Sequence, residues 1–487
     1  MNARRSRGPS RSRLWSLSEH TLVEDLPESD QLVVLTRWGE IVIEDRSPVV
    51  AESLQRMSLG PIHLENVPTL ARDPHGDPAH QLSHVLERLG CCVVQSLGLD
   101  ADTGPMLSVV PVTREARFWD PPHVEPDRPI VLSRFATIRP GKGSLLLESP
   151  LTDFSVVLHR PKAAYVVSAL AQATSIEGLR SQTILAEPVL ADLVSYLVAS
   201  GIVQVGHRDL ADGQPHFDED DDSSLDAWSY YDLEFHARTR LSRYDTELTP
   251  ASQSERLPVE PVVKPPPDGP RFPLHRPDLE LADDLSLTEA IENRRSSFDF
   301  SPRPVSASAI GELLFRVARI RWTRLTRTGD GVEYVVSDRP YPSTADLYEL
   351  ELYVSLDRCP ELPRGTFHYD PGAHSLTLVD DSEPALAELL DTAKIAAGCS
   401  FRPPVLVTMT SRIARLSWLY GTIAYSLTLK HVGELQQTFL LVATAMGLAC
   451  QAPAIIDGTA DEALRLDWPN EVSVGEFLVG FEHEPGR

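Results

Sequence analysis

Residues 287–306 read L-T-E-A-I-E-N-R-R-S-S-F-D-F-S-P-R-P-V-S, and A-I-G-E-L-L-F-R-V-A follows at 309–318. Ser286 and Glu289 have the spacing of a capping box, which predicts that a helix begins here. The helix gives way to a loop at 294–296, Arg-Arg-Ser, where two guanidiniums and a hydroxyl suit the oxygens of a phosphate monoester. From about residue 279 onward, long amphipathic helices with a few strands predict an α+β domain with an anion site near its start.

The composition is that of a large, acidic, globular chain. Its 487 residues hold 45 Lys and Arg against 70 Asp and Glu, so the formal net charge is -25 and the pI about 5.0. This charge argues against a nucleic-acid partner and against an anionic membrane surface. Hydrophobic residues make up 42% and charged residues 24%, which excludes wholesale disorder.

The cysteine pattern indicates a reducing compartment. The chain has 5 cysteines, an odd number, and no C-x-x-C, so neither a disulfide framework nor a thiolate zinc site is supported. The N-terminal arginines are followed by no apolar segment of a secretory signal, and no apolar run reaches the ~18 residues of a membrane span. We therefore expect a cytoplasmic protein with no metal site and no membrane partner.

Two stretches mark boundaries near residues 210 and 270. The run D-E-D-D-D at 218–222 repels itself and predicts a solvated loop. The stretch 258–277 is rich in proline and predicts an extended polyproline-type connector. The predicted divisions are two modules at 14–110 and 130–210, a connector at 211–278, and a C-terminal domain at 279–487.

The part before residue 210 contains a duplicated unit. Residues 83–95 align without gaps on residues 194–206 when Gly90 is set on Gly201. Both stretches predict a helix ended by a left-handed glycine and followed at once by a short strand.

The same order of elements precedes both aligned stretches. A predicted strand pair and helix lie at 32–44 and 48–58 in the first unit, and at 144–159 and 161–173 in the second. Each of these helices starts with a proline, a residue suited to the first helical position. This is the outline of a winged-helix module, so we predict two in tandem.

The partner of these modules follows from their charge. The helices expected at 48–58 and 161–173 carry one basic residue each, Arg56 and Lys162, which argues against DNA recognition. We expect a peptide or protein partner that adds a strand to an exposed sheet edge. The alternative is that the modules only form a scaffold or a dimer contact.

Several motifs follow one another in a fixed order across about 228–480. They are the two stretches quoted first, R-P-Y-P-S at 339–343, L-Y-E-L-E-L-Y-V at 347–354, G-T-F-H-Y-D-P at 365–371, Y-G at 420–421, A-Y at 424–425, and a helix with an apolar face that ends at G-L over 447–448. This series resembles the nitroreductase-like flavoproteins, and among them the SagB/ThcOx-type dehydrogenases that act on ribosomally made, modified peptides. The segment W-S-Y-Y-D-L-E-F-H-A-R at 228–238 resembles one that precedes the flavin domain in that family, and we expect its Tyr230, Tyr231 and Phe235 to belong to the core.

The resemblance implies an FMN enzyme that oxidises thiazoline or oxazoline rings in a peptide to thiazole or oxazole. It also implies a homodimer with flavin at the subunit interface, a precursor peptide as substrate, and a cyclodehydratase or second dehydrogenase-like chain as candidate partner. The residues that it assigns are Tyr420 for proton transfer, Arg294, Arg295 and Ser296 for the FMN phosphate, Pro342 and Ser343 beside the isoalloxazine, and Arg412, Gln451 and Ala452 as further cofactor contacts.

The sequence departs from the family pattern on the cofactor side. Leu419 stands where the family often has a lysine, so Tyr420 would act alone or with Arg412, Arg415 or a water. Phe298 replaces a basic phosphate partner, and residues 344–346, Thr-Ala-Asp, replace glycines expected after Pro-Ser.

These departures leave two alternatives open. One is a catalytically degenerate nitroreductase-like subunit that binds the leader peptide or a partner enzyme without turnover. The other is a different flavin reduction, of quinones or nitro groups.

Overall fold

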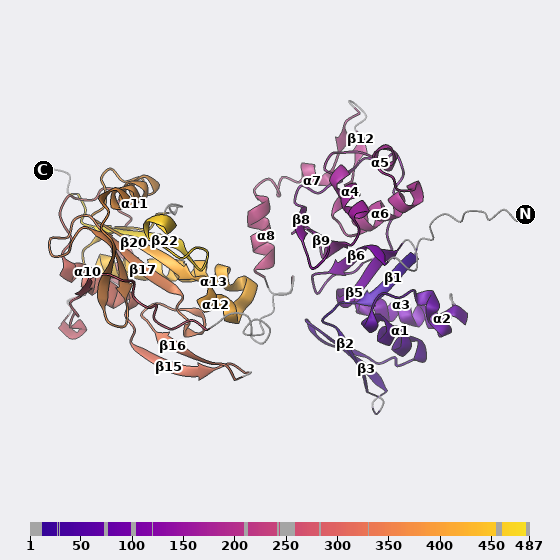
Figure 1. The fold of residues 1–487 in the computed structure, drawn as a ribbon, viewed down its shortest axis with the longest axis horizontal. Helices are drawn as coiled ribbons and strands as arrows, with labels where there is room; N and C mark the ends of the chain where they lie inside the picture. Colours follow the sequence, from indigo (N-terminus) through magenta and orange to yellow (C-terminus); the bar gives the residue numbers. More distant parts are fainter. Residues whose placement is uncertain are drawn as a thin grey trace, which may run out of the picture. The chain divides into compact units, whose positions relative to one another are not determined.

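The computed structural model consists of two compact units, Met1–Thr246 (unit 1) and Glu247–Arg487 (unit 2) (Figure 1). The structure describes residues 12–26, 28, 30–72, 76–98, 104–118, 120–208, 213–240, 243, 259–281, 284–329, 331–453 and 460–483. Each unit has its own hydrophobic clusters.

The first half of unit 1 combines a three-stranded sheet with three helices. Its elements are β1 (Ser12–Leu17), β2 (Leu22–Leu26), β3 (Gln31–Thr36), β4 (Gly39–Ile43), α1 (Pro48–Leu59), α2 (Pro68–Arg72), α3 (Asp77–Arg88), β5 (Val93–Gly98) and β6 (Pro105–Pro111). Strands β2, β3 and β4 pair in that order, and buried side chains of the sheet and the helices form one cluster. The strand pair and the helix expected at 32–44 and 48–58 are confirmed, with Pro48 in the first helical turn, where a missing N–H leaves no bond unmade.

The second half of unit 1 repeats this order of elements. It contains β7 (Ile130–Leu132), β8 (Thr137–Pro140), β9 (Leu145–Glu148), β10 (Phe154–Leu158), α4 (Pro161–Ala169), α5 (Ile176–Gln182), α6 (Glu187–Ala199) and β11 (Val203–Val205). Strands from both halves form one antiparallel six-stranded sheet in the order β1-β5-β6-β10-β9-β8. A strand pair followed by helices in each half is compatible with the predicted winged-helix modules, and the shared sheet joins the two halves.

The two aligned glycines have different roles. Gly201 follows α6 with a φ of 77°, and the Ile202 N–H reaches the carbonyl of Leu197 at 3.2 Å, so the predicted left-handed cap is confirmed there. The prediction is wrong for Gly90, which lies in a 3-10 turn, Gly90–Cys92, without a positive φ. A Cβ at Gly90 would stand 2.8 Å from the carbonyl oxygen of Ala116, so close packing rather than a turn requires the glycine.

Unit 1 ends with β12 (His207–Arg208), β13 (Pro215–His216), α7 (Asp218–Asp221) and α8 (Tyr230–Arg238). The acidic run at 218–222 forms the short helix α7 over 218–221, so the prediction of a loop is wrong there. Its side chains are exposed as expected except at Glu219, whose buried carboxylate accepts the backbone N–H of Arg134 at 2.9 Å. Arg238 ties α8 to Glu148 at 2.9 Å.

The aromatic residues of α8 correct another expectation. Tyr231 is 80% exposed and Phe235 is 40% exposed, so their assignment to the core is wrong. The ion pair of Arg238 with Glu148 joins α8 to β9, whereas the pair of Arg238 with Glu234 lies within the helix.

Unit 2 is built on an antiparallel seven-stranded sheet in the order β14-β19-β18-β17-β20-β22-β21. Its elements are β14 (Arg271–Pro273), α9 (Leu287–Asn293), α10 (Ala307–Ala318), β15 (Trp322–Arg327), β16 (Glu333–Asp338), β17 (Leu350–Leu356), β18 (Gly365–Asp370), β19 (Ser375–Asp380), α11 (Glu383–Ala396), β20 (Val405–Arg412), α12 (Ile413–Tyr420), α13 (Ala424–Ala445), β21 (Ala449–Gln451), α14 (Ala460–Ala463) and β22 (Glu471–Gly480). Strands β15 and β16 form a separate hairpin that stands off from the large sheet (Figure 1).

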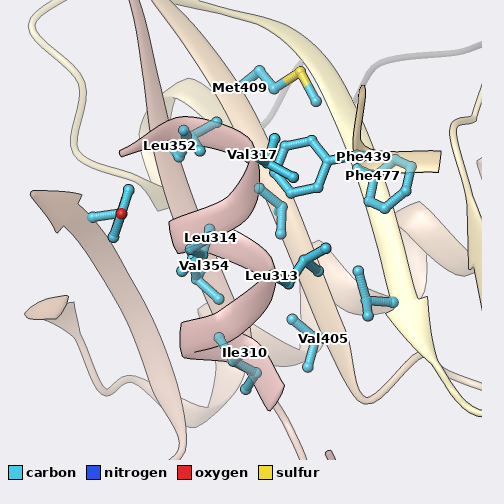
Figure 2. Packing of buried hydrophobic residues seen from close by; sticks show 14 of the residues in the cluster. Ile310, Leu313, Leu314, Val317, Leu352, Val354, Val405, Met409, Phe439 and Phe477 are labelled. Carbon is cyan, nitrogen blue, oxygen red and sulfur yellow. The ribbon is translucent and has the colours of Figure 1, made fainter. Parts of the chain in front are cut away.

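Successive side chains along each strand point to opposite faces of the seven-stranded sheet, and both faces are buried. Leu352 and Val354 of β17 pack with α10 and α13 in the largest cluster of unit 2, and Figure 2 shows α10 laid across them. Tyr353 points the other way and joins a cluster with α11 and α14. Truncating a side chain such as Leu313, which is 2% exposed, is expected to cost roughly 2–5 kcal/mol.

The proline-rich stretch at 258–277 is part of unit 2 rather than a free connector. Strand β14 pairs with β19, and the strap, residues 259–264, lies against the large sheet. Lys264 of the strap pairs with Glu471 of β22 and donates to the hydroxyl of Tyr353 at 2.7 Å. Side chains of the sheet and of α12 also reach the strap's carbonyls.

None of the helices within the described ranges has both the length and the apolar character that crossing a membrane requires.

Candidate active site

The loop 294–296 presents polar groups at the end of a well-defined helix. The capping box is present: Glu289 N–H donates to Ser286 Oγ at 3.2 Å, and Ser286 N–H donates to Glu289 Oε2 at 2.9 Å. The helix ends at Asn293, and the N–H of Ser297 then donates to the carbonyl of Cys450 at 3.0 Å, which holds the loop beside β21.

The side chains of Arg294, Arg295 and Ser296 are available to a ligand. Arg295 and Ser296 are exposed and Arg294 is half-buried. None of the three side chains has a hydrogen bond or ion pair to any residue that the structure describes. Because two guanidiniums without a carboxylate partner lie next to a hydroxyl, this loop suits a phosphate dianion.

The loop 342–348 is held from its buried side. Ser343 Oγ accepts the N–H of Tyr348 at 3.0 Å, and the N–H of Thr344 donates to Nε2 of His431 at 2.9 Å. The other nitrogen of His431, Nδ1, lies 2.8 Å from Glu349 Oε1. Pro342 and Ala345 are exposed, so the outer side of the loop is open to a ligand.

This loop keeps a left-handed backbone without glycine. Ala345, Asp346 and Tyr348 have φ values of 53°, 55° and 50°. Residues with a Cβ rarely adopt this conformation, so the loop stores strain at the place where the family pattern has glycines.

Tyr420 is the last residue of α12 and lies beside the β15–β16 hairpin. It belongs to a small cluster with Trp418 and Tyr334, whose rings are 5.0 Å apart. Burial raises the pKa of Tyr420, and the nearby Tyr334 raises it further. The Tyr420 hydroxyl makes no hydrogen bond within the described parts of the chain, so it is free to meet a substrate.

The two arginines expected near Tyr420 are engaged elsewhere. Arg412 pairs with Glu351 at 2.9 Å and with Glu260 at 3.2 Å. Arg415 donates three hydrogen bonds to backbone carbonyls and is fully buried. Neither guanidinium bonds to the Tyr420 hydroxyl in the described part of the chain, so Leu419 leaves this tyrosine without a cationic partner on α12.

Arg412 forms part of a buried charge cluster on the large sheet. Glu351 also accepts from His368 Nε2 at 2.9 Å, and both residues are almost completely buried. Burial alone would raise the pKa of Glu351, but the hydrogen bond from His368 and the charge of Arg412 lower it to about 2. This carboxylate is therefore ionised at all ordinary pH values and holds β17, β18 and β20 together.

Gln451 is turned into the protein. Its amide nitrogen donates to the carbonyl of Ala397 at 2.9 Å, and Cys399 Sγ approaches Oε1 at 3.4 Å. Ala452 follows β21 and is half-buried. At these two positions only backbone groups are left to meet a cofactor. Phe298 is 56% exposed and has no charge to offer a phosphate.

The two parts of the expected site are attached to different elements of unit 2. The loop 294–297 is bonded to Cys450, which follows the C-terminal end of α13. Thr344 is bonded to His431, which lies in the first half of α13. The helix between His431 and Ala445 is about 21 Å long. The predicted phosphate contacts and the predicted ring contacts of a single chain are therefore held by different elements, β21 and α13.

Sequence reasoning missed the residues that organise this region. His431 and Glu349 were assigned no role, and Arg415 was expected only to assist Tyr420, although the pattern L-Y-E-L-E-L-Y-V at 347–354 carried a signal. Two glutamates in an otherwise apolar strand are expected to be buried, and buried carboxylates need cationic or hydrogen-bonding partners.

Comparisons with known proteins agree with this architecture. Residues 291–480 match the nitroreductase family, and residues 130–245 match ThcOx, the cyanobactin oxidase. A Methanocaldococcus jannaschii protein assigned to the nitroreductases is 23% identical over 199 residues, which are 41% of this chain and 92% of that protein.

Solved structures also align with part of the chain. A chain of the E. coli microcin synthetase McbBCD complex with truncated pro-MccB17 is 21% identical, with a TM-score of 0.33, and the match covers 43% of this chain and 78% of that one. A nitroreductase-like protein of Exiguobacterium sibiricum in complex with FMN is 12% identical, with a TM-score of 0.28, and the match covers 42% and 91%.

Residues 291–480 thus form a nitroreductase-like, α+β oxidoreductase domain, and proteins of the nitroreductase family bind FMN. Because the ThcOx match lies directly ahead of this domain, the expected resemblance to the SagB/ThcOx-type, nitroreductase-like dehydrogenases is confirmed.

Proposed function

We propose that this chain is an FMN-dependent dehydrogenase that oxidises thiazoline or oxazoline rings in a ribosomally synthesised peptide. The observation that carries the proposal is the unpartnered Arg294-Arg295-Ser296 loop in a domain that matches the nitroreductase family. The match of residues 130–245 to a cyanobactin oxidase supports a peptide as the substrate.

The residues present fit FMN at its phosphate end. Arg294 and Arg295 would bind the phosphate dianion, and Ser296 would donate a further hydrogen bond. At the ring end, exposed Pro342 and the loop that follows it would pack against the isoalloxazine, while Gln451 and Ala452 would contribute backbone groups alone. Arg412 would act at a distance, because its guanidinium is held by Glu351 and Glu260.

The chemistry requires a proton acceptor and a hydride acceptor. Oxidising an azoline removes a proton from one ring carbon and a hydride from its neighbour, and bound FMN would supply the hydride acceptor. Tyr420 is the protein group that we assign to the proton. Its raised pKa keeps the phenol protonated at neutral pH, so its action as a base would strengthen as the pH rises.

A homodimer would bring the two parts of the site together. Within one chain the loop 294–296 is attached next to Cys450 of β21, whereas the loop 342–348 is attached to His431 of α13. A second copy could place its Pro342–Ser343 loop over the flavin whose phosphate is held by the first. Size-exclusion chromatography with light scattering, run with and without FMN, tests this arrangement.

Unit 1 is proposed to hold the leader of the precursor peptide. The outer strand β2 exposes Leu22 at 63%, which suits the addition of a peptide strand. Anisotropy of a fluorescein-labelled precursor peptide added to the full chain tests this role. A partner cyclodehydratase or second dehydrogenase-like chain would be expected to increase the affinity.

The colour of the purified protein separates the enzyme from its main alternative, a degenerate subunit without turnover. A yellow protein, or a colourless one that becomes yellow with added FMN, supports the dehydrogenase. A colourless protein that takes up no FMN would favour the non-catalytic adaptor. Reduction of a nitroarene or a quinone in place of azoline oxidation would assign the flavin to another reaction.

The cysteines support a cytoplasmic location. Cys91, Cys92, Cys359, Cys399 and Cys450 are all buried free thiols.

A further inference from the structure

Arg415 joins three separate segments to helix α12. Its side chain is 0% exposed, and it lies on the helix that ends at Tyr420. Nε donates to the carbonyl of Leu347 at 2.9 Å, Nη1 to that of Glu260 at 2.6 Å, and Nη2 to that of Val335 at 2.7 Å.

The three carbonyls belong to parts of the chain that are distant in sequence. Leu347 belongs to the left-handed loop, Glu260 to the strap and Val335 to strand β16 of the hairpin. A buried backbone carbonyl requires a donor, and these three have Arg415 in common. Arginine suits this task because its donors point in several fixed directions in one plane, which no other side chain offers.

The guanidinium remains charged in this environment. Burial lowers the pKa of Arg415 to about 10, and the neighbouring charges of Arg412 and Arg339 lower it as well, while Glu260 and Glu351 act in the opposite direction. Protonation at neutral pH leaves all its N–H groups available to the three carbonyls.

The segments that Arg415 holds are those that surround Tyr420. Tyr334, next to Val335, packs on Trp418 and shares a cluster with Tyr420. The loop held through Leu347 carries Ser343, whose hydroxyl closes the loop onto Tyr348. A displacement of either segment would therefore change both the surroundings of the phenol and the position of the loop.

We propose that Arg415 is a positioning residue that fixes Tyr420 relative to the loop 343–348 and to the β15–β16 hairpin. This inference rests on the proposed function for its kinetic consequence, but its structural consequence stands without it. Arg415 does not touch the reacting atoms; it acts through Leu347 and Val335 on the groups that do.

The test compares Arg415→Lys with Arg358→Lys in the full chain. Lysine keeps the charge at 415 but cannot reproduce three bonds in one plane. Arg358 is a matched control because it too donates to a backbone carbonyl, that of Arg402 at 2.6 Å, on another part of unit 2.

Hydrogen exchange supplies the structural readout. In Arg415→Lys, we expect amide exchange in 333–338 and 344–348 to accelerate at least tenfold, with β17 and β20 unchanged, and Arg358→Lys to match the wild type. Spectrophotometric titration should also show that the pKa of Tyr420 differs from its wild-type value. The signal of Tyr420 is assigned as the one that disappears in Tyr420→Phe. A folded Arg415→Lys with wild-type exchange and wild-type phenol titration would overturn the proposal.

The wild type gives a second test, which is independent of whether the variant folds. If Arg415 couples the segments, amides in 333–338 and in 344–348 should open together, with the same dependence on denaturant. If the amides in 333–338 and those in 344–348 opened with different dependences on denaturant, the coupling would be refuted.

Kinetics with a synthetic thiazoline-containing peptide separates this inference from the proposed function. If the wild type oxidises the ring, Arg415→Lys should lower kcat at least tenfold and change KM less than twofold, and Arg358→Lys should change neither. An unchanged kcat in folded Arg415→Lys would contradict the positioning role. If the wild type does not oxidise the ring, the proposed function fails while the exchange measurements still decide the role of Arg415.

Discussion

The backbone N–H of Thr344 donates to Nε2 of His431 at 2.9 Å, and Nδ1 of the same imidazole lies 2.8 Å from Glu349. Since Nε2 accepts a hydrogen bond from an N–H, the proton of this imidazole belongs on Nδ1, where it is donated to the carboxylate. His431 therefore links a buried glutamate on one side to the left-handed loop on the other.

Removing this imidazole is expected to destabilise unit 2 through Glu349. His431→Leu would leave a carboxylate that is 0% exposed without its partner, at a cost of about 3–5 kcal/mol. His431→Leu/Glu349→Gln removes the charge as well and should recover much of that loss. Urea denaturation of both variants checks the prediction, and equal instability of the single and double variants would contradict it.

The loop 294–296 should determine FMN affinity. Arg294→Ala and Arg295→Ala each remove a charge-assisted bond of about 1.5–3 kcal/mol, so FMN should bind roughly 10- to 100-fold more weakly. Added salt should reduce the difference between these variants and the wild type. Flavin fluorescence titration measures both effects.

Arg324→Ala is the control for that titration. Arg324 is exposed on the hairpin, lies over the ring of Trp322 and forms no ion pair with any residue that the structure describes, so its loss should leave FMN affinity unchanged. Wild-type affinity in both loop variants would remove Arg294 and Arg295 from the site.

Tyr420→Phe should abolish azoline oxidation and keep the bound flavin. Because burial raises the pKa of the phenol, the reactive phenolate is scarce at neutral pH, and wild-type kcat should increase with pH without levelling off below about pH 10. A pH–rate profile with stopped-flow detection of flavin reduction checks the slope. Undiminished turnover in Tyr420→Phe would exclude the residue from proton transfer.

Glu351 should make unit 2 sensitive to acid. Its pKa is near 2 in the folded chain against an ordinary value of 4.5, so ionised Glu351 stabilises the fold by an amount on the order of 3 kcal/mol above pH 4.5. A lowered carboxyl pKa means that this contribution is lost as the pH falls from 4.5 through 2.

The free energy of unfolding, measured by denaturation at pH 7 and at pH 3, checks this predicted loss of stability. The wild type should lose more stability between the two than Glu351→Gln does, by roughly 2 kcal/mol. Asp391→Asn, which breaks the exposed pair with Arg402, is the control and should change stability by less than about 1 kcal/mol. Identical pH dependence in Glu351→Gln and wild type would show that Glu351 is not the responsible carboxyl.

Substitution by glycine should stabilise unit 2 at Ala345 and destabilise it at Ala387. Ala345 has a φ of 53°, so Ala345→Gly relieves backbone strain and should stabilise unit 2 by up to about 1 kcal/mol. Ala387 lies inside α11, where Ala387→Gly should cost about 1 kcal/mol. Thermal unfolding of both variants measures the signs, and destabilisation by both would show that the loop carries no such strain.

Local signals in the sequence were sufficient to predict several helix ends. The capping box at Ser286 and Glu289, the prolines that begin α1 and α4, and the left-handed Gly201 all formed as predicted. These signals work because their interactions lie within one turn of the chain, so no distant partner is needed. The ordered motifs also predicted the nitroreductase-like domain that the family match confirms.

Tertiary structure decided what each polar residue touches. The sequence predicts a helix cap at Gly90, but in the structure Ala116 packs against this glycine. The sequence also predicts a free connector at the proline-rich stretch, which instead supplies the strap of unit 2. Arg415 meets carbonyls of Glu260, Val335 and Leu347, which are 68 to 155 residues away along the chain. Composition and periodicity report the face of a helix or strand on which a residue lies, but only the packed sheet, helices and loops bring such distant groups within hydrogen-bonding distance.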